Sequence, residues 1–312
     1  MKRVPIRWAA LAVAGWMAAC GGEGGRTFLS LGTAGTGGIY YPLGGALASR
    51  LSITDDARQY TAEVSGGSVE NINRLAAGQM DLAMVLAATA YQSHQGLEDW
   101  EEAISGLRAL APLYPNLTHV MVPRRSDAAG IADLGGQRVS VGPPGSGTEQ
   151  IARHLLQAHG LSYDDIDVRF LSFGESSSAL RDGAIDAAVI SVGYPAAAVL
   201  EATTTAGVRL LPVDADVVAS MNEEHPYYTA AVMPAGAYPG VEAAIPTMAV
   251  HNWIVAMDTL DDEVVTILLN ILANDRVSLE QVHAMAKQID LDLLGDPPIP
   301  LHAAASSWIS QR

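Results

Sequence analysis

The chain has 312 residues, of which 49% are hydrophobic, and its 34 acidic residues against 18 basic ones give a net charge of −16. This length and apolar content suffice for the core of one large domain or two moderate ones. The negative charge argues against nucleic acid and anionic lipid surfaces as partners, because both would repel the protein.

The first 19 residues have the pattern of a secretory signal peptide. Lys2, Arg3 and Arg7 precede an apolar run over residues 8–19. This run is too short to span a bilayer, and it ends in small residues of the kind found before a cleavage site. We therefore expect residues 1–19 to be a signal peptide that is removed from the mature protein.

Cys20 follows this leader and is the only cysteine, so the fold cannot use internal disulfides. Its position resembles a lipoprotein processing site, although Met17 stands where such sites usually have leucine. We expect a lipoprotein signal peptide with lipidation of Cys20, and ordinary cleavage near Ala19 is the alternative. The glycine-rich residues 20–26 are expected to form a tether. The mature protein would then be extracytoplasmic, or periplasmic, and would contact the membrane only through its lipid anchor.

Two glycine-rich turns each connect an apolar strand to an amphipathic helix. The first covers residues 32–38 after a strand at 28–31, and the second covers residues 142–150 after a strand at 138–141. The first amides of a helix lack intrahelical partners and lie at the positive end of its dipole. Main chain alone could therefore hold a carboxylate or phosphate at each turn. A plain tight connection is the alternative for either turn.

Strands and helices alternate along the chain, which indicates an α/β fold with mostly parallel sheets. Further strands are expected near residues 61–64, 81–85, 108–113, 168–171, 187–191 and 208–212. The last third predicts a buried strand over residues 247–256, helices over 261–273 and 278–289 with N-caps Asp261 and Ser278, and a short helix over 302–309.

One segment of this pattern occurs twice. Both copies run from a Ser/Gly turn through a short helix to Gly-x-x-Asp and an apolar strand, and each follows its own glycine-rich turn. At a constant offset of 105 residues, Leu75, Gly78 and Asp81 recur as Leu180, Gly183 and Asp186. The repeat predicts two lobes of similar construction. A chance recurrence of a common helix cap is the alternative.

A two-lobed α/β protein binds its ligand in the crevice at the carboxyl ends of the strands, where both glycine-rich turns would face. Extended stretches at residues 119–123 and 228–234 are expected to form the hinge where the chain changes lobes. The expected division is therefore a discontinuous first lobe, residues 27–119 plus 235–312, and a second lobe, residues 120–234.

Motifs for catalysis and metal binding are missing from the sequence. Residues 142–148 lack the lysine of a nucleotide-binding P-loop, and there is no Gly-x-Ser-x-Gly nucleophile elbow. His154 and His159, the nearest histidine pair, are five residues apart and face different sides of their helix, unlike the i, i+4 pair of a zinc site. The sequence therefore predicts no enzyme activity, no catalytic residue, no metal site and no cofactor.

Seven motifs spread over the mature chain resemble the TAXI-type solute receptors of tripartite ATP-independent periplasmic (TRAP) transporters. They are GTAGTGGIYYPLGG at 32–45, GGSVEN at 66–71, VGPPGSGTE at 141–149, GAIDAA at 183–188, GYP at 193–195, PAGAYPG at 234–240 and PIPLH at 298–302. The resemblance implies a two-lobed, periplasmic-binding-protein-like (type II) α/β fold with a ligand cleft between the lobes. It also implies a solute-binding protein that captures a small organic acid or amino acid and delivers it to the membrane permease subunits of a TRAP transporter.

The resemblance further implies which residues contact the solute. Backbone amides and hydroxyls from both lobes can satisfy a carboxylate, and contact with both halves favours the closed state. Tyr40 and Tyr194 could instead serve only in packing. The implied ligand-binding residues are Ala34, Gly35, Thr36, Gly37, Tyr40, Ser65, Gly67, Ser68, Leu86, Ala87, Ser146, Gly147, Thr148, Gly193 and Tyr194.

One departure from the family concerns the solute. Where the family usually has polar residues after an apolar strand, this chain has VLAAT at residues 85–89. The missing donors and acceptors would weaken the hold on the polar head of an amino acid. We therefore expect a solute with one carboxylate and a body that is smaller or more apolar than that of glutamate.

Two other functions share part of these features. A ligand-sensing lobe that presents its ligand to a membrane signalling protein would have the same anchor and cleft, and it is the main alternative. An extracytoplasmic enzyme is the weaker alternative, because it would need an activated nucleophile or a metal site.

Overall fold

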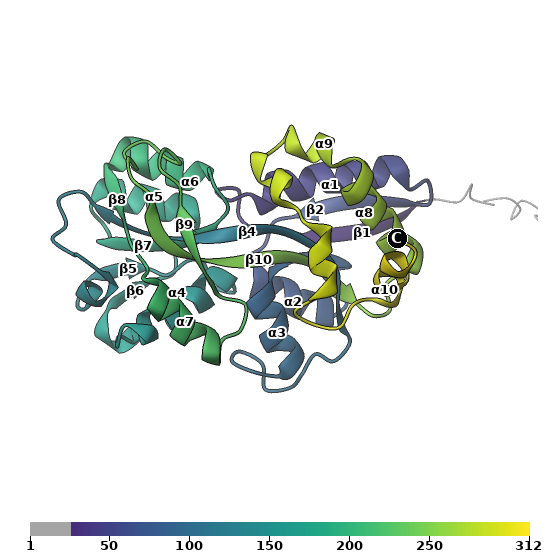
Figure 1. Cartoon of the computed structure of the whole chain (residues 1–312), viewed down its shortest axis with the longest axis horizontal. Coiled ribbons are helices and arrows are strands. Elements are labelled where there is room, and N and C mark those ends of the chain that lie inside the picture. Colours follow the sequence, from purple (N-terminus) through teal and green to yellow (C-terminus); the bar gives the residue numbers. More distant parts are fainter. Residues whose placement is uncertain (1–25) are drawn as a thin grey trace, which may run out of the picture.

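The computed structural model describes residues 26–312, which form two lobes joined by two long strands (Figure 1). The predictions for the signal peptide, for Cys20 and for the tether up to residue 25 lie outside the described residues. Helices cover both faces of a ten-stranded sheet, with strand order β2-β1-β3-β10-β4-β7-β5-β6 and with β8 and β9 beside β4 and β10. Among the described helices, none is long and apolar enough for a membrane span.

The first lobe begins with strands and helices in strict alternation. Its strands are parallel and lie in the order β2-β1-β3. The elements are β1 (Thr27–Gly32), α1 (Tyr40–Thr54), β2 (Arg58–Glu63), α2 (Ser68–Ala76), β3 (Leu82–Leu86) and α3 (Ala87–Gln95).

The second lobe repeats this arrangement with parallel strands in the order β6-β5-β7. Its elements are η1 (Ile131–Leu134), β5 (Arg138–Ser140), α4 (Gly147–Ala158), η2 (Tyr163–Asp165), β6 (Asp167–Arg169), α5 (Phe173–Asp182), β7 (Ala187–Val192), α6 (Ala197–Glu201), the π-helical turn η3 (Ala202–Ala206), β8 (Val208–Leu211), α7 (Ala215–Glu224) and β9 (Thr229–Met233).

Two strands run from one lobe into the other. β4 (Leu107–Pro123) pairs with β7 and β8 at its second-lobe end, and β10 (Ile245–Met257) pairs with β3 at its first-lobe end. All pairings of β4 and β10 with other strands are antiparallel. The expectation of mostly parallel sheets is therefore wrong: the sheet is mixed, because the strand beside β3 and the strand beside β7 each arrive from the opposite lobe.

The segments expected to form the hinge are extended in the structure. Residues 119–123 are the end of β4, whereas residues 228–234 contain β9, which pairs with the second-lobe end of β10. The crossing back to the first lobe is thus made by β10 itself. The lobe boundaries inferred from these segments stay a prediction.

The internal repeat has a structural counterpart in its aspartates. Asp81 Oδ2 accepts a hydrogen bond from the Ser30 amide at 2.7 Å, and Asp186 Oδ2 accepts one from the Arg138 amide at 3.0 Å. In each lobe the carboxylate at the start of one strand thereby holds the neighbouring parallel strand. The two copies perform the same task in the fold, as the shared Gly-x-x-Asp pattern predicts.

The C-terminal segment packs against the first lobe through short elements. These are α8 (Asp262–Asn274), α9 (Arg276–Glu280), η4 (Ala284–Gln288), η5 (Leu291–Gly295) and α10 (Ala303–Ser310). Asp261 caps α8 as predicted, its carboxylate accepting from the Glu263 amide. The prediction of one helix over 278–289 with Ser278 as N-cap is wrong, because Ser278 lies inside α9 and a turn separates α9 from η4. Both α9 and η4 bury apolar residues, and the spacing of these residues along 278–289 resembles that of a single amphipathic helix.

Asp186 supplies a test of the strand anchor. The hydrogen-bonded Arg138 guanidinium holds the pKa of Asp186 below its usual value. A carboxyl with a lowered folded pKa stabilises the protein above its unfolded pKa, about 3.9, and this contribution is lost as the pH falls through the folded pKa. Asp186→Asn should therefore lower the free energy of unfolding at pH 7 by about 1 kcal/mol, a value reduced for the partial exposure of the side chain.

Urea denaturation between pH 7 and pH 3 measures this effect, and the gap between wild type and variant should shrink in acid. Asp182→Asn is the control, because Asp182 lies on the same lobe and its side chain is 63% exposed. A gap that stays constant over this pH range would contradict the anchoring role of the carboxylate.

Candidate ligand-binding site

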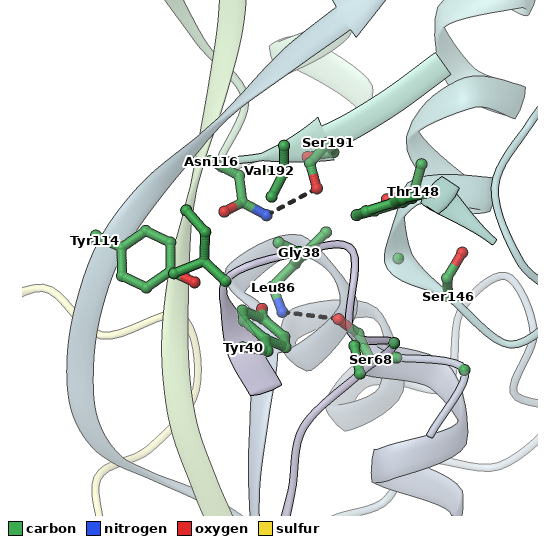
Figure 2. A pocket seen from close by; sticks show the side chains of 17 residues that line it. Gly38, Tyr40, Ser68, Leu86, Tyr114, Asn116, Ser146, Thr148, Ser191 and Val192 are labelled. Atoms are coloured by element: carbon green, nitrogen blue, oxygen red, sulfur yellow. Dashed lines mark hydrogen bonds between the residues drawn. The ribbon is translucent and has the colours of Figure 1, made fainter. Parts of the chain in front are cut away.

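A cavity of about 40 Å³ lies between the lobes, beside the crossing strands (Figure 2). Since a cavity that holds one water has a volume of about 10–15 Å³, this cavity suits a small group such as a carboxylate. The lining residues are Ala34, Gly35, Gly38, Ile39, Tyr40, Gly66, Gly67, Ser68, Leu86, Tyr114, Asn116, Ser146, Gly147, Thr148, Phe173, Ser191 and Val192.

The positive ends of three helices border this cavity. Tyr40, Ser68 and Gly147 are the first residues of α1, α2 and α4. Ser146 caps α4 by accepting a hydrogen bond from the Glu149 amide at 3.1 Å, which leaves the earlier amides of this helix without an intrahelical partner. Among the described residues that line the cavity, none is lysine or arginine. The arrangement therefore suits an anion held by helix dipoles and neutral donors.

The floor of the cavity is a buried hydrogen-bond network that connects the two lobes. Tyr40 Oη donates to Asn252 Oδ1 at 2.5 Å, and Asn252 Nδ2 donates to Asn116 Oδ1 at 2.8 Å. Asn116 Nδ2 in turn donates to the carbonyl oxygen of Ser191 at 3.1 Å. The network runs from α1 through β10 and β4 to β7, so it fixes the polar floor across the lobe boundary.

Two hydroxyls at this floor have no hydrogen-bond partner within residues 26–312. They are Tyr114 Oη and Ser191 Oγ, both buried and both on residues that line the cavity. Burial raises the pKa of Tyr114 well above its ordinary value, so the phenol stays protonated and remains a donor. An unpaired buried hydroxyl is costly. These two groups are placed to donate to a bound acceptor.

The remaining wall is apolar. Ile39 and Leu86 of the first lobe and Phe173 and Val192 of the second line the same cavity. Ser68 Oγ accepts from the Leu86 amide at 3.1 Å, and its hydroxyl also contacts the Tyr40 phenol. The cavity thus combines a donor-rich floor with an apolar side.

A second, larger pocket of about 450 Å³ adjoins the cavity and shares Ala34, Gly35, Gly66 and Phe173 with it. Thr36, Gly37 and Ser65 line this outer pocket. Among its described lining residues only Glu201 is charged. A solute can therefore place one group in the inner cavity and its body in the outer pocket.

The lobes are in contact around the cavity, which gives the closed form. The Glu70 amide donates to the Gly145 carbonyl oxygen at 3.0 Å, and Thr89 Oγ1 donates to Gln150 Oε1 at 2.7 Å. A Cβ atom on Gly66 would lie 2.4 Å from the Pro144 carbonyl oxygen, so the approach at this point requires glycine.

The structure brings most of the expected site residues to one place. The inner cavity is lined by Ala34, Gly35, Tyr40, Gly67, Ser68, Leu86, Ser146, Gly147 and Thr148, and the outer pocket adds Thr36, Gly37 and Ser65. Neither pocket is lined by Ala87, Gly193 or Tyr194. Ala87 begins α3 next to Leu86, and Gly193 packs behind the floor, where an added Cβ would lie 3.0 Å from the Tyr114 ring.

Eight lining residues were outside the expected set. Three of them, Gly38, Ile39 and Gly66, adjoin residues of that set in the two glycine-rich segments, and the other five are Tyr114, Asn116, Phe173, Ser191 and Val192. Tyr114 and Asn116 interrupt the apolar run of β4, and this interruption is the one sequence signal that points to them. Contact of β7 residues with the solute depends on the lobe arrangement and has no local signal.

Comparison with solved structures places the fold among periplasmic binding proteins. The methylphosphonate complex of PhnD1 from Prochlorococcus marinus matches with a TM-score of 0.56 at 12% identity, covering 91% of this chain and 96% of that one. The aliphatic sulphonate binding protein SsuA from Escherichia coli matches with a TM-score of 0.50 at 16% identity, covering 92% and 84%. An ancestral arginine-binding protein bound to arginine matches with a TM-score of 0.50 at 16% identity, covering 85% and 99%.

At these identities the likeness establishes the two-lobed α/β fold alone. The sequence itself gives the family. The model of the NMT1-like family matches residues 31–308, and the chain belongs to this family.

Proposed function

We propose that this protein is an extracytoplasmic receptor that captures a small organic monocarboxylate between its lobes and delivers it to a transporter. The observation that carries the proposal is the pair of unpartnered buried hydroxyls, Tyr114 Oη and Ser191 Oγ, in a cavity bordered by three helix N-termini. A bound carboxylate would accept from these donors and meet the positive ends of the helices. Solved neighbours of the same fold that bind small solutes support a binding role.

The charge of the site favours a monoanion. A phosphonate dianion would bring two charges into a cavity whose described lining has no lysine or arginine to neutralise them. A sulfonate has three oxygens to satisfy, whereas a carboxylate has two. Glu201 in the outer pocket opposes a second carboxylate on the body of the solute, although its pairing with Arg181 at 3.2 Å weakens this effect.

The apolar wall favours an apolar body. Leu86 and Ala87 occupy the positions where polar residues of TAXI-type receptors are expected, and Leu86 lies on the inner cavity. An ammonium group beside Leu86 and Phe173 would lose its hydration without gaining a partner. The solute that fits this site is therefore less polar than glutamate.

The sequence motifs indicate the membrane partner to which the receptor delivers its solute. The seven motifs of TAXI-type receptors support a TRAP-type permease as the membrane partner, and Cys20 supports a lipid anchor that keeps the receptor near that membrane. A lipid anchor with a flexible tether allows the cleft to reach a permease without a membrane span.

A ligand panel tests the class of solute. Isothermal titration calorimetry with apolar monocarboxylates, glutamate, succinate, alkylsulfonates and methylphosphonate should show the apolar monocarboxylates binding most tightly. A ligand at about a hundred times its dissociation constant should also raise the free energy of unfolding by roughly 2.7 kcal/mol, seen as a thermal shift. Tight binding of glutamate with no binding of apolar monocarboxylates would contradict the proposal that the solute has an apolar body. Tight binding of a phosphonate would contradict the proposal that the solute is a monoanion.

Removing either unpaired hydroxyl tests the floor of the site. Tyr114→Phe and Ser191→Ala should each weaken the best ligand of the panel by about 10- to 100-fold, because each deletes one hydrogen bond to a charged group. Thr118→Val is the matched control: its hydroxyl is also buried and unpartnered within the described residues and lies on β4, but outside the cavity lining. If Tyr114→Phe and Ser191→Ala bound the ligand with the same affinity as Thr118→Val, the proposed position of the carboxylate would be wrong.

Gly147→Ala tests whether closure is needed for binding. An added Cβ would lie 2.5 Å from Leu86 Cδ1 and 3.0 Å from Ser68 Oγ, both of the opposite lobe. Overpacking of this kind costs about 1–3 kcal/mol, so the affinity should fall about fivefold or more. Gly147 is the first residue of α4, where alanine is a good helix former, so the thermal stability without ligand should not fall.

Gly45→Ala on α1 is the control for Gly147→Ala, since an added Cβ there meets no atom within 4 Å. Its ligand affinity should equal that of the wild type. Unchanged affinity in Gly147→Ala would mean that the solute does not bind the closed form.

A further inference from the structure

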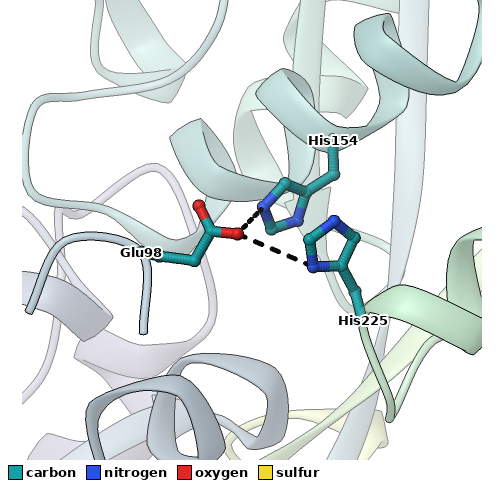
Figure 3. A group of neighbouring side chains, drawn as sticks. All are labelled: Glu98, His154 and His225. Carbon is teal, nitrogen blue, oxygen red and sulfur yellow. Dashed lines mark ion pairs between the residues drawn. The ribbon is translucent and has the colours of Figure 1, made fainter. Parts of the chain in front are cut away.

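A second group of polar side chains bridges the lobes at a distance from the cavity (Figure 3). The loop after α3 of the first lobe presents Glu98, while α4 and the end of α7 in the second lobe present His154 and His225. Glu98 lies in the left-handed region with φ of 57°, which non-glycine residues adopt rarely. Trp100 secures the loop to its own lobe through a hydrogen bond from Nε1 to Asn73 Oδ1 at 2.9 Å.

The three side chains aim at one point. Glu98 Oε1 lies 3.4 Å from His154 Nε2 and 3.8 Å from His225 Nδ1, and the three ligand atoms all lie within 4.8 Å of one another. The imidazole rings stack with centroids 3.6 Å apart and planes 10° apart. The two distances from Glu98 Oε1 to the histidine nitrogens both exceed the 2.7–3.2 Å of a good hydrogen bond. The groups therefore converge without satisfying each other.

His154 has the features of a metal-binding imidazole. It is buried, its Nδ1 lies 2.9 Å from the Tyr228 hydroxyl, and its Nε2 has no hydrogen-bond partner within the described part of the chain. A second partner on the remote nitrogen is the usual way in which proteins orient a histidine that ligates a metal.

The charges nearby also suit a cation. Arg153 is the neighbouring guanidinium, and it is shared by Glu98 at 3.4 Å, Asp99 at 3.4 Å and Glu149 at 3.6 Å. Three carboxylates face one guanidinium, so negative charge remains. Glu98 directs Oε2 to Arg153 and Oε1 to the histidines, which leaves Oε1 free for an ion.

We propose that Glu98, His154 and His225 bind a divalent transition-metal ion of the zinc type, which links the two lobes. Two imidazoles and one carboxylate are a known zinc donor set that leaves a position open to water. Tetrahedral bonds of about 2.0–2.1 Å separate donor atoms by about 3.3 Å, which matches the 3.4 Å between Glu98 Oε1 and His154 Nε2, whereas His225 Nδ1 at 3.8 Å would have to approach. Because an imidazole nitrogen donates in the plane of its own ring, the partly exposed His225 must turn out of its stack with His154 for both rings to reach one ion.

The metal site has a consequence for solute capture. Because Glu98 belongs to one lobe and the histidines to the other, the ion binds the closed form more tightly than the open one. Ion and solute then raise each other's affinity, since coupling between two sites is reciprocal. This coupling rests on the proposed receptor function, whereas the metal binding itself does not.

Calorimetric titration of Zn²⁺ into untagged, chelator-treated protein tests the site. The wild type should bind one Zn²⁺, and Glu98→Gln and His225→Ala should bind it about tenfold or more weakly. These two side chains are partly exposed, so the variants should fold, which a thermal melt checks. His159→Ala, at the residue that follows α4, is the matched control and should bind Zn²⁺ like the wild type.

Equal Zn²⁺ affinities for the wild type, Glu98→Gln and His225→Ala would overturn the site, as would a loss of binding in His159→Ala. The coupling is read from solute affinity with and without Zn²⁺, which should differ by about fivefold or more. Zn²⁺ binding with an unchanged solute affinity would refute the coupling. Zn²⁺ binding in a protein that binds no solute of the panel would support the site and contradict only the receptor function.

Discussion

The meeting of three positive helix ends around one small cavity is the constraint on which the rest of the molecule depends. α1 and α2 belong to the first lobe and α4 to the second, so closure brings like partial charges together. Each helix end interacts with a nearby charge by about 0.3–2 kcal/mol. With an anion between them, the same ends attract it from both sides. On the proposed function, closure of the lobes and capture of an anion are therefore one coupled equilibrium.

The crossing strands make the floor of the site as well as the connection between lobes. Asn116 of β4 and Asn252 of β10 lie where these strands pass between the lobes, and both belong to the network that starts at Tyr40. Tyr114 lies two residues before Asn116 on the same strand. A solute that accepts from Tyr114 would thus contact one of the two strands that connect the lobes.

Local patterns predicted the parts of the fold that are local. The glycine-rich turns and the Asp81 and Asp186 anchors each follow from a few consecutive residues, and the structure places both turns at one cavity. Tyr114 and Ser191 could not be identified as site residues from the sequence, because a polar residue inside an apolar strand has the same pattern whether it contacts a ligand or the core. The mixed sheet was missed for a related reason. The direction of a neighbour in a sheet depends on the path of the whole chain, which the alternation of strand and helix does not record.

Helix α4 relates the two interlobe sites to each other. Thr148 borders the cavity, and His154 is six residues further along, about 9 Å on the rise of an α-helix. Because the helix is rigid, the spacing at which Glu98 meets His154 also determines how closely Gly147 approaches Leu86. The carboxylates of Glu98, Asp99 and Glu149 meet at this contact with Arg153 as the shared cation. Closure concentrates negative charge there, so a cation that neutralises this charge favours the closed arrangement of the lobes around the cavity.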